Sequence, residues 1–130
     1  MASSAKVTNN ISIQVQTRFQ EEASDPNEPY YLFAYRITIE NQGPHPVRLL
    51  RRTWEIFDAN NHHRQVEGAG VVGQQPIIQP GEQFSYQSAC NLATELGSMK
   101  GQYIMENLIT RETFSAEIPE FVLVTPARLN

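Results

Sequence analysis

A glycine motif is the feature of this sequence whose spacing points most directly to chemistry. Gly68, Gly70 and Gly73 match the G-x-G-x-x-G pattern that binds a pyrophosphate in dinucleotide-binding proteins. That chemistry also needs a helix beginning directly after the glycines, so that its N-terminus faces the phosphates. Pro76 and Pro80 leave no room for such a helix. We therefore interpret the segment as a loop between strands, and phosphate binding by its backbone amides stays open as an alternative.

A cluster of basic residues on an otherwise acidic chain is the second candidate. Arg48, Arg51 and Arg52 lie close together in the sequence, and Arg64 follows in the next expected strand. Guanidinium groups bind carboxylates and phosphates well, so the cluster predicts a docking patch for an acidic partner or a phosphate. The alternative is ion pairing with acidic residues of neighbouring strands, in which each exposed pair contributes little. The acidic residues concerned are Glu55, Asp58 and Glu67.

Metal-ligating and nucleophilic side chains are few, and their spacing is unfavourable. His62 and His63 are adjacent, so in a strand they point to opposite faces and do not share one ion. His45 lies in a different turn, and the acidic residues at 21–28 do not have EF-hand spacing. Cys90, the only cysteine, lacks a flanking sequence typical of an activated nucleophile. We therefore predict no catalytic residues, no metal site and no cofactor, and we expect a chain that is not an enzyme.

Length and charge narrow the class of protein. The 130 residues suit one domain with its own hydrophobic core, and the net charge of -4 argues against binding nucleic acid. No apolar run approaches the roughly 20 residues that a membrane-spanning helix needs, so we expect no membrane partner. A single cysteine excludes an intrachain disulfide and favours a cytoplasmic location. We place the domain at residues 8–126, with a disordered tail at residues 1–7 and a C-terminal tail at residues 127–130.

Alternating apolar and polar residues predict the elements that carry these candidate sites. Such runs, each typical of a half-buried strand, occur at residues 11–19, 30–41, 47–57, 62–67, 83–89, 101–108, 112–118 and 121–124. Turn-forming residues separate the runs, and no segment shows a convincing helical period. The pattern predicts an all-β fold, an immunoglobulin or fibronectin type III-like β-sandwich of about seven or more antiparallel strands.

Three residue types refine this expectation. Trp54 is expected between the two sheets, with Tyr35 and Phe33 nearby. The arginines interrupt the alternation of the 47–57 strand, and such an irregularity indicates a bulge or a sheet edge. Pro119 is expected to end one strand before a short closing strand, because proline cannot donate a backbone hydrogen bond to a ladder.

Six segments together carry a resemblance to a known family. They are residues 15–18, 33–41, 49–54, 67–76, 79–82 and 118–121. In combination they are specific, and they resemble the ApaG proteins, also called CorD, from about residue 11 to residue 126 of the chain. The hairpin at residues 108–112 departs from the Asp-Gly turn expected of the family, which leaves the type of that turn open.

The resemblance implies a fibronectin type III-like β-sandwich, which agrees with the alternation, and a small bacterial cytoplasmic protein. Similar domains in larger eukaryotic proteins, including F-box proteins, look like interaction modules. The family names connect it with cobalt and magnesium tolerance and with a gene neighbour that hydrolyses diadenosine tetraphosphate. None of this implies a reaction or a catalytic residue.

We therefore expect a non-enzymatic module that binds another protein, with Arg48, Arg51 and Arg52 as the preferred patch. Two alternatives stay open, namely binding of a phosphate or nucleotide through the glycine motif and a role in divalent-cation tolerance for cobalt or magnesium. A homodimer formed by self-pairing of an edge strand is open as well.

Overall fold

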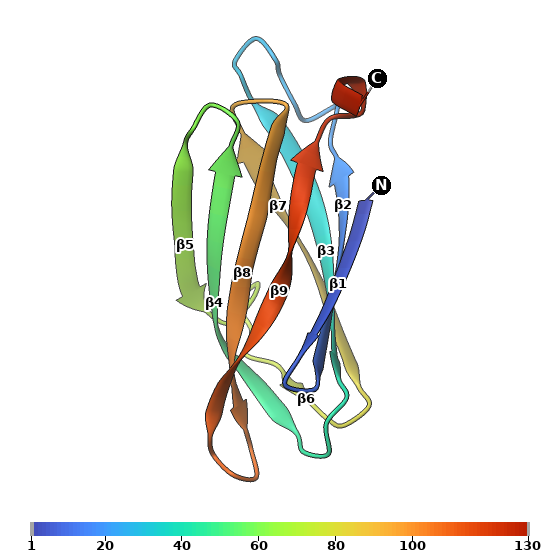
Figure 1. Ribbon diagram of the computed structural model, residues 1–130, viewed down its shortest axis with the longest axis vertical. Coiled ribbons are helices and arrows are strands. Elements are labelled where there is room, and N and C mark those ends of the chain that lie inside the picture. The colour runs from blue at the N-terminus through green and yellow to red at the C-terminus, as the bar shows by residue number, and fades with distance from the viewer. Residues whose placement is uncertain (1, 130) are drawn as a thin grey trace.

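Two antiparallel sheets face each other in the computed structural model, which describes residues 2–129 (Figure 1). The first sheet has the order β1-β2-β3-β7, formed by Ala2–Thr8, Ile11–Phe19, Tyr31–Asn41 and Gln83–Leu92. The second has the order β5-β4-β8-β9, formed by His63–Ala69, Val47–Asp58, Leu96–Asn107 and Thr113–Val124. The short β6 (Ile77–Ile78) also pairs with β4, and Pro126–Leu129 form a 3₁₀ turn. The expected all-β sandwich is confirmed.

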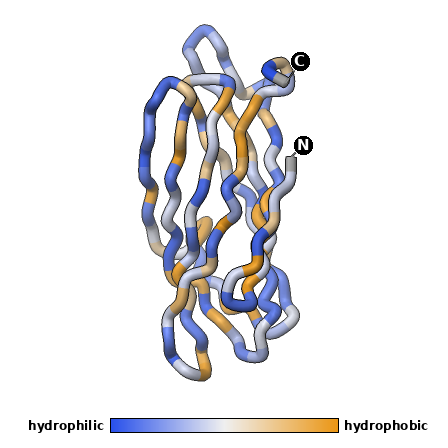
Figure 2. Tube along the Cα trace, in the orientation of Figure 1, coloured by the Kyte–Doolittle hydropathy of each residue, from blue (hydrophilic) through white to orange (hydrophobic). Residues whose placement is uncertain are grey.

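The hydrophobic core lies between the sheets and follows the alternation of the sequence, which is visible along the strands in Figure 2. Trp54 is buried as expected, and its ring meets that of Tyr35 edge to face at 5.6 Å. The ring of Phe121 completes this aromatic group at 5.9 Å from Trp54. Phe33 is buried too, and its ring lies 5.2 Å from that of Phe19.

The N-terminal segment corrects one expectation. Residues 2–7, predicted to be a disordered tail, lie in β1, which pairs along its whole length with β2. Asn9 and Asn10 connect the two strands with positive φ angles of 51° and 66°, which is the geometry of a tight type I′ hairpin that asparagine tolerates. This turn reverses the chain direction, so that the N-terminal segment pairs with β2 as an edge strand. Met1 lies outside the described residues.

Pro119 also departs from expectation, because it does not end a strand. β9 continues through it, and the pairing with β8 shifts between Met99 and Gly101, so that Pro119 and Glu120 lie opposite Lys100 alone. At a bulge on an edge strand, a residue need not donate a backbone hydrogen bond to the neighbouring strand. Proline, which has no N–H, is therefore tolerated there without ending the strand.

A second bulge confirms the irregularity predicted for the arginine-rich strand. The pairing of β4 with β8 shifts between Leu49 and Arg51, so Leu50 is the extra residue. The strand is not an edge, because β4 pairs with β8 on one side and with β5 and β6 on the other. Beyond the bulge, odd-numbered residues of β4 face outward and even-numbered residues face the core.

The described residues contain no helix long and apolar enough to cross a lipid bilayer.

Candidate functional site

The glycine motif lies where the sequence predicted it, in a connection between strands. Gly68 belongs to β5, and Gly70 and Gly73 follow it with φ angles of 61° and 79° before the chain reaches β6. Val71 and Gln74 exchange backbone hydrogen bonds of 2.8 and 2.9 Å, and this closes a tight turn. The next element after Gly73 is the strand β6, so no helix begins directly after the motif. The interpretation of this segment as a loop between strands is confirmed.

Backbone hydrogen bonds within the protein occupy several amides of this loop. The N–H of Gly70 donates to the carbonyl of Leu50 at 2.8 Å, and the N–H groups of Val71 and Gln74 are used in the turn. A Cβ on Gly70 would lie 2.0 Å from the carbonyl oxygen of Gln74, so glycine is needed there for close packing of the backbone. The glycine spacing therefore has a structural explanation in the turn itself.

The three arginines of the predicted patch do not share one surface. Arg51 is exposed on the outer face of the second sheet, whereas Arg52 points to the inner side. The guanidinium of Arg52 donates to the carbonyl oxygens of Ala69 and Gly70 at 3.2 and 2.8 Å. Arg48 is partly buried, and its Nε has no hydrogen-bond partner in the described chain. The bulge at Leu50 and the strand alternation separate the three side chains, and sequence proximity alone could not show this.

The other chemically versatile side chains are also dispersed. His62 and His63 are exposed near the β4–β5 turn, while His45 lies near Asn107 with 3.1 Å between its Nδ1 and the amide nitrogen. Cys90 is buried on β7. Within residues 2–129 there is no group of three or more histidine, cysteine, aspartate or glutamate side chains arranged to hold a metal ion. The acidic residues 21–28 lie in the β2–β3 loop.

Burial, rather than catalytic activation, explains why the pKa values of one cysteine and three tyrosines are raised. Desolvation raises the pKa of the Cys90 thiol, although a hydrogen bond from Arg64 opposes the shift. Burial likewise raises the pKa values of Tyr35, Tyr86 and Tyr103, and the hydroxyls of Tyr86 and Tyr103 hydrogen-bond to each other in the core. Groups held neutral in this way are poor nucleophiles and bases at neutral pH.

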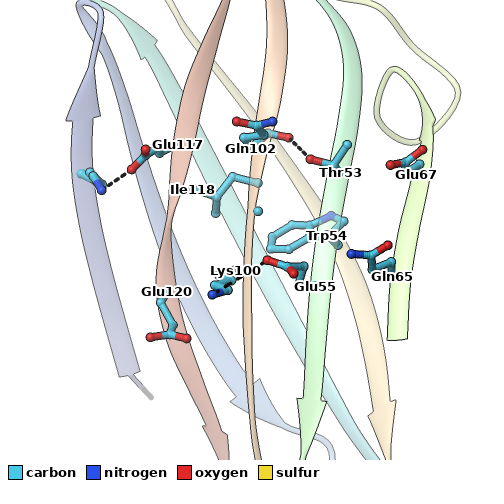
Figure 3. A pocket seen from close by; sticks show the side chains of 12 residues that line it. Thr53, Trp54, Glu55, Gln65, Glu67, Lys100, Gln102, Glu117, Ile118 and Glu120 are labelled. Carbon is cyan, nitrogen blue, oxygen red and sulfur yellow. Dashed lines mark hydrogen bonds and ion pairs between the residues drawn. The ribbon is translucent and has the colours of Figure 1, made fainter. Parts of the chain in front are cut away.

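A groove of about 550 Å³ lies on the outer face of the five-stranded sheet (Figure 3). Five strands contribute to it, namely β1, β4, β5, β8 and β9. Its charged side chains are Lys6, Glu55, Glu67, Lys100, Glu117 and Glu120, and Thr53, Gln65 and Gln102 add neutral polar groups. Four carboxylates against two ammonium groups make the groove acidic.

Ion pairs hold some of the groove charges in place. Lys6 pairs with Glu117 across the two sheets, and the Nζ of Lys100 lies 3.9 Å from Glu55 (Figure 3). The side-chain carboxylates of Glu67 and Glu120 make no ion pair or hydrogen bond with any described residue. These two carboxylates flank the groove on β5 and β9, so they are available to cationic groups of a ligand.

Sequence reasoning missed this groove because its residues come from distant parts of the chain. Lys6 and Glu117 are brought together only because β1 lies beside β9, and the bulge opposite Lys100 is visible only in the strand pairing. The available signal was the polar half of each alternating run, which does not show which of these side chains lie together.

Comparisons with known proteins agree on one family. The family model of the ApaG domain matches residues 21–107. A protein named ApaG from Dechloromonas aromatica (strain RCB) is 48% identical over 122 residues, covering 92% of this chain and 94% of its own. A protein ApaG from Parvibaculum lavamentivorans is 45% identical over 120 residues, covering 92% of each chain. The crystal structure of a Bordetella pertussis protein described as a putative ApaA is similar, with a TM-score of 0.85 and 39% identity over 94% of this chain and 95% of that one.

Proposed function

The chain belongs to the ApaG family, and from this premise we propose that it is a non-enzymatic domain that binds another protein through the outer face of its five-stranded sheet. The observation that carries the proposal is the acidic groove, in which the carboxylates of Glu67 and Glu120 have no partner among residues 2–129. We propose that the partner offers an exposed segment with lysine or arginine side chains. Such complementary charges steer association and select the partner more than they raise affinity.

The shape and rigidity of the groove support this proposal. Its walls are strands rather than loops, so the backbone positions that carry the carboxylates are fixed before a partner arrives, which lowers the entropic cost of binding. It is open and polar, unlike the enclosed and mostly apolar pockets that hold small molecules. Arg51 lies on the same outer face but outside the groove, where its guanidinium could bind an acidic side chain of the partner.

Two alternatives receive less support. For a nucleotide site, the glycine turn offers few unused amides, and the Arg52 guanidinium already donates to backbone carbonyls. An NMR titration with pyrophosphate would decide, since shifts confined to residues 67–75 would favour that site. For divalent-cation tolerance, the described residues offer no cluster of ligands, and calorimetry with cobalt and magnesium is the direct test.

Two further assignments belong to the same proposal. The strand orders of the two sheets support a fibronectin type III-like sandwich, with β1 as an added edge strand. A cytoplasmic location is supported by the single cysteine, which is buried as a free thiol.

The test compares partners captured from a bacterial lysate by three purified, folded forms of the protein. The forms are the wild type, the groove variant Glu67→Lys/Glu120→Lys, and a control, Glu22→Lys/Glu28→Lys, with the same charge change in the exposed β2–β3 loop. We expect a protein that binds the wild type and the control but not the groove variant, and NMR shifts at groove residues when that partner is titrated. Identical capture by all three forms would contradict the proposal.

A further inference from the structure

β7 has a free edge that lacks the usual protection. It pairs with β3 on one side, and no described strand pairs with the other. Its ten residues, Gln83–Leu92, include no charge and no proline, and its register with β3 is unbroken by a bulge. Natural edge strands are generally blunted by one of these devices, because an unprotected edge invites another strand. By contrast, the edge strand β5 carries His63, Arg64 and Glu67.

The strand alternation identifies the backbone groups at this edge. The N–H of Asn41 donates to the carbonyl of Glu82 at 3.1 Å, so alternate residues from 82 onward face β3 and those between them face away. The outward set begins at Gln83 and includes Gln87 and Asn91. Arg64 reaches the Asn91 carbonyl from that side, with its Nη2 at 2.7 Å. An incoming strand would therefore find a row of backbone donors and acceptors.

β5 extends beyond the opposite sheet on the same side of the sandwich. In Figure 1, β5 is the outermost strand, and no strand of the four-stranded sheet lies behind it. By register, Arg64, Val66 and Gly68 share the inner face with Ile56, Trp54 and Arg52. Yet Val66 is 38% exposed, whereas Trp54 is 3% exposed. The inner face of β5 thus lacks the cover that a further strand beside β7 would supply.

A hollow of about 280 Å³ lies at one end of the uncovered space beside β7 and beneath the inner face of β5. It lies between the β4–β5 hairpin and the end of β7, and Ile56, Arg64, Asn91 and Leu92 are among its lining residues. Asp58 also lines it, but its carboxylate accepts hydrogen bonds from the N–H of Ala93 and the hydroxyl of Thr94. The carboxylate is therefore engaged with the β7–β8 connection.

Two guanidinium groups, those of Arg64 and Arg52, face the uncovered space beside β7 and have no carboxylate partner. Arg64 donates to the sulfur of Cys90 at 3.3 Å and to the Asn91 carbonyl, and Arg52 donates to the carbonyls of Ala69 and Gly70. Neither forms an ion pair with any residue in the described range 2–129. A carboxylate can accept two parallel hydrogen bonds from one guanidinium and carries a full negative charge, whereas a backbone carbonyl is neutral, so acidic side chains would compete well for both arginines.

We propose that an extended acidic segment of a partner protein adds to the free edge of β7 and lies beneath β5. Its backbone pairs with the outward groups of β7, while two carboxylates bind Arg64 and Arg52. Since Arg52 lies over Gly68, the two cationic positions are four residues apart along β5, or about 13 Å. A strand with acidic residues at i and i+4 and an apolar residue at i+2 over Val66 matches this spacing in either direction. This surface is separate from the outer groove, so the inference stands whether or not the groove binds a protein.

A second copy of the chain fits this position poorly. Antiparallel pairing of β7 with its own copy would keep both five-stranded sheets on the same side of a joined sheet. Because β5 extends past β7, it would occupy the space needed by β4 of the other copy. A single peptide strand has no second layer and avoids this conflict.

The test is an NMR titration with a synthetic peptide, Thr-Thr-Glu-Thr-Val-Thr-Glu-Thr-Thr, at low salt. We expect saturable shifts and slower amide exchange at Ser85, Gln87 and Ala89. Replacing both glutamates by lysine is expected to weaken binding about tenfold or more, because the charge-assisted bonds are lost. No saturable shift at millimolar peptide, or equal binding of the lysine peptide, would overturn the proposal.

Three variants of the protein test whether the peptide binds at the edge of β7 and to the inner arginines. Arg64→Gln removes one guanidinium and Gln87→Pro removes one outward N–H, and each is expected to weaken binding about tenfold. Arg51→Gln makes the same charge change on the outer face and should bind as the wild type does. Urea unfolding checks that each variant is folded. Shifts at groove residues instead of β7, self-association of the protein, or equal loss with Arg51→Gln would contradict the inference.

Discussion

The guanidinium of Arg52 lies directly over the bare Cα of Gly68. A Cβ at position 68 would be 2.9 Å from both terminal nitrogens of Arg52, closer than real contacts allow. The two residues are register partners on β4 and β5, and the missing side chain lets the guanidinium cross β5 to the carbonyl of Gly70. One glycine of the motif and one arginine of the predicted patch therefore form a single structural unit.

Gly68→Ala is expected to displace Arg52 and lower the free energy of unfolding by about 1–2 kcal/mol. The hydrogen bonds of a charged donor are lost, while alanine in a strand recovers part of the cost. In an Arg52→Ala background the same substitution should cost close to nothing. Urea unfolding of the four proteins of this cycle measures the coupling, and additive effects would show that the contact does not matter.

Gly70→Ala and Gly73→Ala form a matched pair with very different expected costs. Both glycines have positive φ, but a Cβ at Gly70 would meet the backbone of Gln74, whereas nothing lies within 4 Å of a Cβ at Gly73. We expect a loss of about 1 kcal/mol for Gly73→Ala and about 3 kcal/mol or more for Gly70→Ala. Thermal unfolding is a sufficient measurement, and equal losses would contradict the close approach.

Val72→Asn is expected to stabilise the protein by about 1 kcal/mol. Val72 has a φ of 41° at the tip of the turn and is 56% exposed, and β-branched residues pay a penalty for positive φ. Asparagine followed by Gly73 is the favoured pair for this kind of turn. Chemical unfolding of both forms tests this, and an unchanged or lower midpoint would count against strain at Val72.

Tyr103→Phe is expected to cost about 1–3 kcal/mol, because it leaves the buried hydroxyl of Tyr86 without its partner. The double variant Tyr86→Phe/Tyr103→Phe should be more stable than the sum of the two single losses predicts, since no buried hydroxyl then remains unpaired. Urea unfolding measures the three variants, and strict additivity would show that the pair contributes no coupling.

Stability should fall as pH rises above about 9–10. The folded pKa values of Cys90, Tyr35, Tyr86 and Tyr103 are all raised by burial above the ordinary values of 9.0 and 10.0. The unfolded chain therefore loses these protons first, and each such loss favours unfolding. Urea titrations from neutral to alkaline pH should show the decline, and Tyr86→Phe/Tyr103→Phe should flatten it. A flat profile in the wild type would be the contrary result.

Much of the fold follows from local patterns. The alternation of apolar and polar residues located β2 to β5 and β7 to β9, and the burial of Trp54 followed from its place in β4. The N-terminal strand was missed because Ala2–Thr8 is short of large apolar residues, and its pairing depends on the Asn9-Asn10 turn. The continuity of β9 through Pro119 depends on a bulge in the pairing with β8, which no local pattern reveals.

The sequence by itself determined that this chain forms a β-sandwich, because most of its strands carry an alternating run of apolar and polar residues that defines a buried and an exposed face. It also determined that the glycine segment is a loop, because two prolines exclude a helix. Only the tertiary structure decided which side chains meet. Lys6 and Glu117 share a groove, Arg51 and Arg52 face opposite sides, and Arg64 reaches β7, since register, bulges and sheet order set these contacts between residues distant in the chain.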